Sequence, residues 1–270
     1  MLNRSRAPNR HRHSLWALAG ALLGALAGAL VFAPAAWLAQ GVQSASHGRL
    51  LLADAQGTVW QGHALMVLTG GPGSRDAAVL PSRLEWRLGV SSQGLKLGLA
   101  QACCIAPEVS LTLAPGWGQW RVNIQTGASK EIGQWPAGWL EGLGAPLNTL
   151  RPAGHLRLSA HDASVVRKGQ GAALGGRLEL DLLQTSSRLS TLDPLGSYRL
   201  TLTGDAQGST LVNLLTLEGA LQLSGQGQVD AKGLHLRGEA RASSGQEAAL
   251  NNLLNIIGRR TGAVSVLSIG

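Results

Sequence analysis

Apolar and polar residues alternate along most of the chain after residue 46. In the segment Leu178–Leu182, for example, leucines occupy every second position and acidic residues lie between them. Successive side chains of a strand point to opposite faces, so a period of two predicts strands with one apolar and one polar face. The same pattern occurs in segments 84–88, 95–99, 109–113, 120–124, 156–158, 198–202, 221–223 and 234–236. Glycine-rich turns separate the segments, which predicts a mainly β chain with an antiparallel sheet.

Two segments depart from this period and predict short helices. Residues 136–143 begin with a proline, which is favoured at the first turn of a helix, and place Trp139 and Leu143 one turn apart. Residues 246–260 repeat apolar side chains at helical spacing and end on a glycine and two arginines. A last apolar strand is predicted at 264–269.

The predicted elements also suggest a duplication. Several alternating strands and one short helix occur in residues 40–145, and the same set occurs again in residues 146–270. The match is one of architecture and not of residues. We therefore interpret these ranges as two similar β halves that meet at a turn near Pro146.

Residues 14–39 carry no charged side chain. As a helix, the apolar run from Leu15 to Ala39 would be about 37 Å long, enough to cross a hydrocarbon core of about 30 Å. Trp16 and Trp37 lie near its ends, where indole rings favour the membrane interface. The run is longer than the apolar region of about 7–15 residues in a cleaved signal peptide. It predicts an uncleaved transmembrane anchor, with cleavage near Ala45 as the alternative.

The charge of the chain is unevenly distributed. The net charge is +8, but four of the 23 basic side chains lie in residues 1–13, which contain no acidic residue. Basic residues before an anchor stay in the cytoplasm, so residues 1–13 are predicted to be a cytoplasmic tail and the β region to lie outside. The remaining sequence has no basic stripe of the kind that binds DNA, which argues against nucleic acid as a partner.

Three glycines lie on one face of the predicted anchor. Gly20, Gly24 and Gly28 are four residues apart, and small residues at this spacing let two transmembrane helices approach closely. Anchors rich in alanine and glycine also produce this spacing by chance. The glycines are therefore a candidate helix contact, with chance spacing as the alternative.

Cys103 and Cys104 are the two cysteines of the chain. Outside the cytoplasm disulfides persist, and three states compete: a bridge between the two neighbours, bridges to other chains, and free thiols. Strict strand alternation would point the two side chains apart, whereas a turn before Pro107 would allow the vicinal bridge. We favour a vicinal disulfide with a conformational role.

Tryptophan dominates the aromatic residues, with eight against one Tyr and one Phe. Six of the eight lie between residues 60 and 139. We favour a role as bulky core residues, with a tryptophan-bearing surface for a partner or lipid as the alternative.

The sequence contains no recognisable catalytic or metal-binding motif. The G-x-S-x-G elbow, the Walker loop, H-E-x-x-H and C-x-x-C are all absent, and the histidines lack metal-ligand spacing. We therefore predict a chain that is not an enzyme and takes no cofactor or metal.

A short motif near the start of the β region resembles a known family. Gly57, Thr58, Val59, Trp60 and Gly62 follow the predicted anchor and are similar to the G-T-V-W-x-G signature of type II secretion system protein N. Segment 84–88, the turn at 194–198 and the end of the chain from Leu250 to Gly270 are also similar in kind and order.

The resemblance implies a single-pass protein of the inner membrane with its C-terminal region in the periplasm. Such a protein is an accessory, non-enzymatic component of the system that exports folded periplasmic proteins through an outer-membrane secretin. Its partners would be other secretion components of the inner membrane, or the secretin. The motif is interpreted as structural: Gly57 and Gly62 would allow turns, and Trp60 would anchor a short strand in the core.

The leucine-rich alternation also fits a second function. A curved sheet with a continuous leucine face could hold acyl chains, so the alternative is a membrane-anchored periplasmic β-groove protein that binds or moves lipid.

Overall fold

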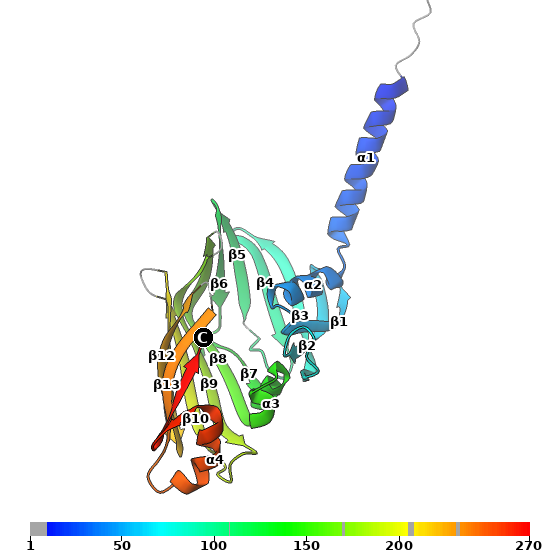
Figure 1. The fold of residues 1–270 in the computed structure, drawn as a ribbon. Coiled ribbons are helices and arrows are strands. Elements are labelled where there is room, and N and C mark those ends of the chain that lie inside the picture. Colours follow the sequence, from blue (N-terminus) through cyan, green and yellow to red (C-terminus); the bar gives the residue numbers. More distant parts are fainter. Residues whose placement is uncertain (1–9, 108, 169–170, 205–207, 231–232) are drawn as a thin grey trace, which may run out of the picture.

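The computed structural model describes residues 10–107, 109–168, 171–204, 208–230 and 233–270. These residues form one antiparallel sheet of fifteen strands, together with short helices (Figure 1). The strands of the first part are β1 Leu50–Gly57, β2 Gln61–Thr69, β3 Ala77–Ser91, β4 Gly94–Gln101, β5 Ser110–Gly116, β6 Gln119–Gln125 and β7 Glu131–Pro136. Those of the second part are β8 Pro152–Lys168, β9 Gly171–Ser187, β10 Gly196–Gly204, β11 Thr210–Gly219, β12 Leu221–Asp230, β13 Gly233–Ala242, β14 Arg259–Thr261 and β15 Val264–Ile269. The predicted mainly β, antiparallel fold is confirmed.

The helices are short apart from the first. They are α1 Arg10–Val31, α2 Ala35–Ala45, the 3-10 helix η1 Ala137–Leu143, α3 Leu147–Leu150 and α4 Glu247–Ile257. Within the described ranges, we find no helix with the length and apolar character needed to cross a membrane. Residues 1–9 of the predicted basic tail lie outside the described residues, and residues 10–13 belong to α1.

The two predicted short helices are present with shifted ends. Pro136 belongs to β7, and the helix after it is of the 3-10 type. At the other site, α4 ends at Ile257 and the next residues turn back as β14. Gly258, which lies between them, has extended backbone and ends the helix.

The two predicted halves share a single sheet. The strand order follows the chain from β1 to β13, with β7 beside the main path and β15 placed before β14. The predicted dividing turn near Pro146 lies at α3, yet β8 pairs with β6 and β7 on one side and with β9 on the other. Hydrogen bonds therefore continue across the boundary, because β8 is long enough to pair with both preceding strands.

The strand registers place the apolar residues on one side of the sheet, which we call the leucine face. Across β8, β9 and β10, Leu156 pairs with Leu182, which pairs with Tyr198. In the first part, Leu97 pairs with Leu111, which pairs with Ile124. A strand shift of one residue would expose these side chains, so the alternation fixes the register.

Helix α2 covers the leucine face at the start of the sheet. Its buried Ala35 and its partly buried Leu38 pack against Leu52, Leu84 and Trp86 of β1 and β3. The uncharged run 14–39 is therefore shared between two helices. The helix breaks before Pro34, because proline has no N–H to donate and disfavours helical backbone in the residue before it.

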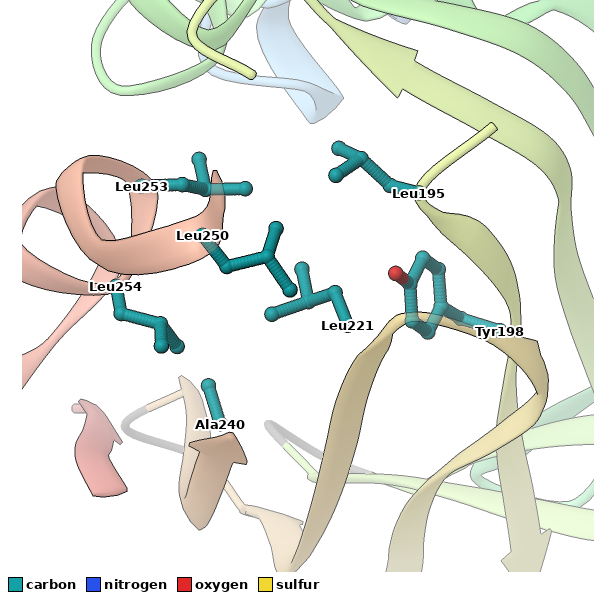
Figure 2. Packing of buried hydrophobic residues seen from close by; sticks show 7 residues of the cluster. All are labelled: Leu195, Tyr198, Leu221, Ala240, Leu250, Leu253 and Leu254. Atoms are coloured by element: carbon teal, nitrogen blue, oxygen red, sulfur yellow. The ribbon is translucent and has the colours of Figure 1, made fainter. Parts of the chain in front are cut away.

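Helix α4 covers the leucine face at the other end of the sheet (Figure 2). Leu250, Leu253 and Leu254 are at most 2% exposed and pack against Tyr198 and Leu221. Three apolar residues within five positions form the buried side of this helix. Full burial of a leucine contributes about 1.5–3 kcal/mol, so these side chains account for most of the attachment of α4.

The opposite, polar face carries a cross-strand ion network on β8–β10. The Asp181 carboxylate accepts hydrogen bonds from Arg199 at 2.7 and 2.8 Å and from Arg157 at 2.8 Å. Asp181 is 2% exposed although it lies on the solvent face, since the two arginines cover it. The hydrogen bond from Arg199, followed by that from Arg157, holds the pKa of Asp181 below its usual 3.8 against the effect of burial.

Candidate functional site: the junction between α1 and the sheet

The family motif forms the turn between β1 and β2. Gly57 is the last residue of β1 and pairs with Gly62 of β2. Between them, Thr58 closes the turn: its N–H donates to the Gln61 carbonyl at 2.8 Å, and its hydroxyl accepts from the Gln61 N–H at 3.1 Å. The motif is therefore a hairpin turn that two hydrogen bonds between Thr58 and Gln61 close.

This turn holds the end of α1. Trp60 Nε1 donates a hydrogen bond of 2.8 Å to the Leu30 carbonyl in the last turn of α1. The Val59 N–H donates to the Ala33 carbonyl at 2.8 Å, and Pro34 forms an isolated bridge with Thr58. The last carbonyls of a helix have no partner inside the helix, so the Trp60 indole satisfies one of them. Three polar contacts thus fix where α1 leaves the sheet.

The prediction that Trp60 anchors a short strand in the core is wrong. Trp60 is half-buried in the turn and not part of a core strand. The core residue beneath the turn is Trp86 of β3, 3% exposed, whose Nε1 lies 3.2 Å from the carbonyl oxygens of both Thr58 and Val59. Two indole groups therefore hold the turn from its two sides.

The two motif glycines are required by close approach. Gly57 has φ of 92°, and a Cβ there would lie 2.5 Å from the Gln61 carbonyl oxygen. A Cβ on Gly62 would lie 2.6 Å from the Trp86 ring. A side chain at Gly57 would collide with the backbone of β2, and one at Gly62 would collide with the β1 backbone and the Trp86 ring, so the glycines are structural, in agreement with the interpretation from sequence.

The glycines of α1 lie on a surface that contacts nothing else among the described residues. Gly20 and Gly24 are exposed, and a Cβ at Gly20, Gly24 or Gly28 would have no heavy atom within 4 Å. A helix contact at these glycines stays a prediction.

Cys103 and Cys104 form a vicinal disulfide in the turn after β4, with an S–S distance of 1.99 Å. The Ser82 hydroxyl donates to Cys103 Sγ at 2.9 Å, and Cys104 packs against Leu80 and Trp135 in a buried cluster. The Cys104 carbonyl accepts a hydrogen bond of 2.7 Å from the backbone N–H of Gln134. The bridged turn therefore connects β3 with β7 from outside the regular ladder.

The tryptophans divide into core and surface residues. Trp86 and Trp135 are buried, and Trp139 stacks on Trp135 with ring centroids 6.4 Å apart. Trp117 and Trp120 are 103% and 53% exposed. The predicted core role is thus confirmed for Trp86 and Trp135. It is wrong for Trp117 and Trp120, because no other element among the described residues packs over the β5–β6 turn.

The junction offers hydrogen bonds and apolar contacts rather than reactive groups. Within the ranges that the structure describes, no three His, Cys, Asp or Glu side chains gather in a way that could hold a metal ion. The nearest ion pair joins Arg83 to Asp54, the residue at the bulge of β1, and the hydrogen bond from Arg83 lowers the pKa of Asp54. The arrangement is suited to fixing a helix on a sheet.

The comparisons with known proteins agree with the motif. The family model described as Type II secretion system (T2SS), protein N, matches residues 48–266. The chain belongs to this family. The resemblance seen in the motif is confirmed, and a type II secretion protein N is a component of protein export. The matched range runs from shortly after the end of α2 at Ala45 to Val266 in β15, and it includes the complete strands β1 to β14, so the junction joins the family region to the helices that precede it. No curated protein matches the chain, and no solved structure does.

Proposed function

We propose that this chain is a single-pass accessory component of the type II secretion machinery in the inner membrane. Residues 1–13 lie in the cytoplasm, the uncharged segment that begins at Ser14 anchors the chain, and the sheet lies in the periplasm. The chain then assists export of folded proteins by contacting other secretion components. The family match over residues 48–266 is the observation that carries this proposal.

The surface of α1 supports the anchor. Leu22, Leu23 and Leu26 are 63%, 71% and 68% exposed, and Figure 1 shows α1 standing clear of the sheet. Transfer of a leucine side chain out of water is favourable by about 1.5–3 kcal/mol, which a lipid environment would provide. The arginines before this segment and the hydrogen-bonded junction after it orient the sheet away from the cytoplasm.

The edge of β1 is the contact surface that we propose for secretion partners. β1 pairs with β2 on one side, and no strand among the described residues pairs with its other side. The opposite edge, β14, has three residues and carries two arginines, which discourages pairing with another strand. An eight-residue edge that adjoins the membrane helix can accept a strand from a partner.

Site-specific photo-crosslinking in cells tests this function. The photoreactive residue is placed at Ala53 of β1, and the matched control is placed at Arg259 of β14 on the far edge. We expect ultraviolet light to join the β1 position to an identified inner-membrane secretion component or to the secretin. Absence of any secretion component from both positions, with the chain present in the membrane fraction, would reject the proposal.

A second candidate function is lipid binding on the leucine face. Between the areas covered by α2 and α4, side chains such as Leu111, Leu113 and Val122 are half-buried. A row of partly exposed apolar side chains can hold an acyl chain. Native mass spectrometry of the detergent-solubilised chain distinguishes the functions: co-purifying phospholipid, lost when Leu111 is changed to Gln, favours the lipid function.

A further inference from the structure

The turn between β5 and β6 exposes a pair of tryptophans. Trp117 lies in the two-residue turn and is fully exposed, and Trp120 at the start of β6 is 53% exposed. Val90, near the β3–β4 turn, is 83% exposed. We call Val90, Trp117 and Trp120 the apolar tip. Exposed side chains of this size are costly in water unless another surface covers them.

The apolar tip lies at the end of the sheet from which α1 leaves. Since successive strands are antiparallel, the β1–β2, β3–β4 and β5–β6 turns all lie at one end of the sheet. The β1–β2 turn holds Leu30 of α1 through Trp60. Figure 1 shows the β5–β6 turn and α1 projecting on the same side of the molecule.

The residues around the apolar tip are basic. Segments 86–107, 109–130 and 163–178 contain no Asp or Glu, and they supply Arg121 beside Trp120 and Arg167 opposite it on β8. Both arginines are exposed. Indole rings favour the headgroup region of a bilayer, and nearby arginines are attracted to anionic headgroups.

We propose that the apolar tip inserts into the anionic surface of the same membrane that α1 enters, so that the sheet touches the bilayer at two separate points. This inference rests on the proposed anchor. With α1 alone, the sheet would be held to the membrane at one point, the junction. A second contact at β5–β6 would hold the strands upright on the membrane. A membrane surface fits better than a protein partner, because aromatic and cationic groups share one end with the helix.

Photo-crosslinking to lipid tests the proposal directly. The full chain carrying p-benzoylphenylalanine in place of Trp117 is reconstituted into phosphatidylethanolamine–phosphatidylglycerol vesicles. Illumination is expected to give a phospholipid adduct, seen by mass spectrometry of the peptide that contains position 117. Val79, 56% exposed at the opposite end of β3, is the control position and is expected to give no adduct. A protein adduct in cells in place of lipid, or no adduct at position 117, would overturn the proposal.

Charge removal provides a second readout. Arg121→Gln and Arg167→Gln are each expected to lower the adduct yield about fivefold in anionic vesicles, and to leave the yield in phosphatidylcholine vesicles unchanged. Equal loss in both lipids would reject the role of the arginines. Carbonate extraction tests separately whether α1 holds the chain in the membrane. If the chain stays in the membrane fraction but gives no adduct at position 117, the proposed insertion of the apolar tip is refuted. If carbonate releases the chain from the membrane and the adduct still forms, the proposed α1 anchor is refuted.

Discussion

The β1–β2 turn shows how single residues can decide a junction. Its geometry needs a glycine beneath the Trp86 ring, a tryptophan that reaches the end of α1 and a threonine that closes the turn. Trp60 and Thr58 form hydrogen bonds with backbone groups, and Gly62 leaves room for the close approach of the backbone and the Trp86 ring. The motif is therefore better understood as a joint than as a binding site for a ligand.

Gly62→Ala is expected to destabilise the chain by about 1–3 kcal/mol, because the new methyl group would collide with the Gln56 carbonyl oxygen and with the Trp86 ring. Urea unfolding of the detergent-solubilised chain, followed by tryptophan fluorescence, measures this loss. The control is Gly89→Ala on the same sheet, where a Cβ would have no heavy atom within 4 Å. Equal midpoints for the two variants would contradict the role of close packing at Gly62.

Asp181→Asn tests the ion network on the polar face. The lowered pKa of Asp181 means that the folded chain binds its proton less readily than the unfolded chain. Its contribution is therefore fully present above about pH 4 and lost as the pH falls further. We expect Asp181→Asn to cost about 1–2 kcal/mol at pH 7, since the partly exposed arginines weaken the ion pair, and progressively less as the pH falls below about 4.

Unfolding midpoints between pH 3 and pH 7 measure that difference. Glu239→Gln changes an exposed carboxylate on β13 and is the control, with an effect within about 0.5 kcal/mol. A loss for Asp181→Asn that stays constant over the whole pH range would show that charge is not the cause.

At the scale of elements, helices close the two ends of the leucine face. α2 packs on β1 and β3, and α4 packs near β10, β12 and β13. Both helices contribute apolar side chains to a sheet that supplies one apolar face. Their positions define which part of the leucine face stays half-buried and open to a lipid or a partner.

Leu254→Ala is expected to destabilise the chain by about 2–5 kcal/mol, since Leu254 is fully buried and the cavity would lie between α4 and Ala240. Asn251→Ala on the exposed side of the same helix is the matched control and should change stability by less than about 0.5 kcal/mol. Thermal unfolding followed by circular dichroism compares them. Similar melting temperatures would show that α4 is not attached through this cluster.

Much of this arrangement could be predicted from alternation, but not all. The repeat in Leu178–Leu182 identified β9 because each leucine needs the same face. The break at Pro34 does not follow from the apolar run, because its alanines suit a membrane helix and a sheet-packed helix equally well. The hydrogen bond from Trp60 to Leu30 joins residues thirty positions apart, so the local spacing of residues cannot predict it.

For the whole molecule, one sheet predicts one unfolding transition. Residues 146–270 alone would leave the β8 edge without β6 and β7 and would expose the leucine face beside it. We therefore expect this fragment to aggregate or remain unfolded, and the full chain to unfold in a single step. Circular dichroism of the purified fragment measures this. A soluble fragment with a cooperative melt would instead support two independent halves.

The order of the strands bears on how the molecule is made. From β1 to β6, and again from β8 to β13, each strand pairs with the one synthesised just before it. A growing chain can therefore add strands in sequence, starting at the turn that grips α1, without waiting for distant partners. Assembly would finish when β15 docks on β13 and α4 closes over the end. If α1 is the anchor proposed above, the strands nearest the membrane would form first, and a chain stalled during synthesis would already be oriented.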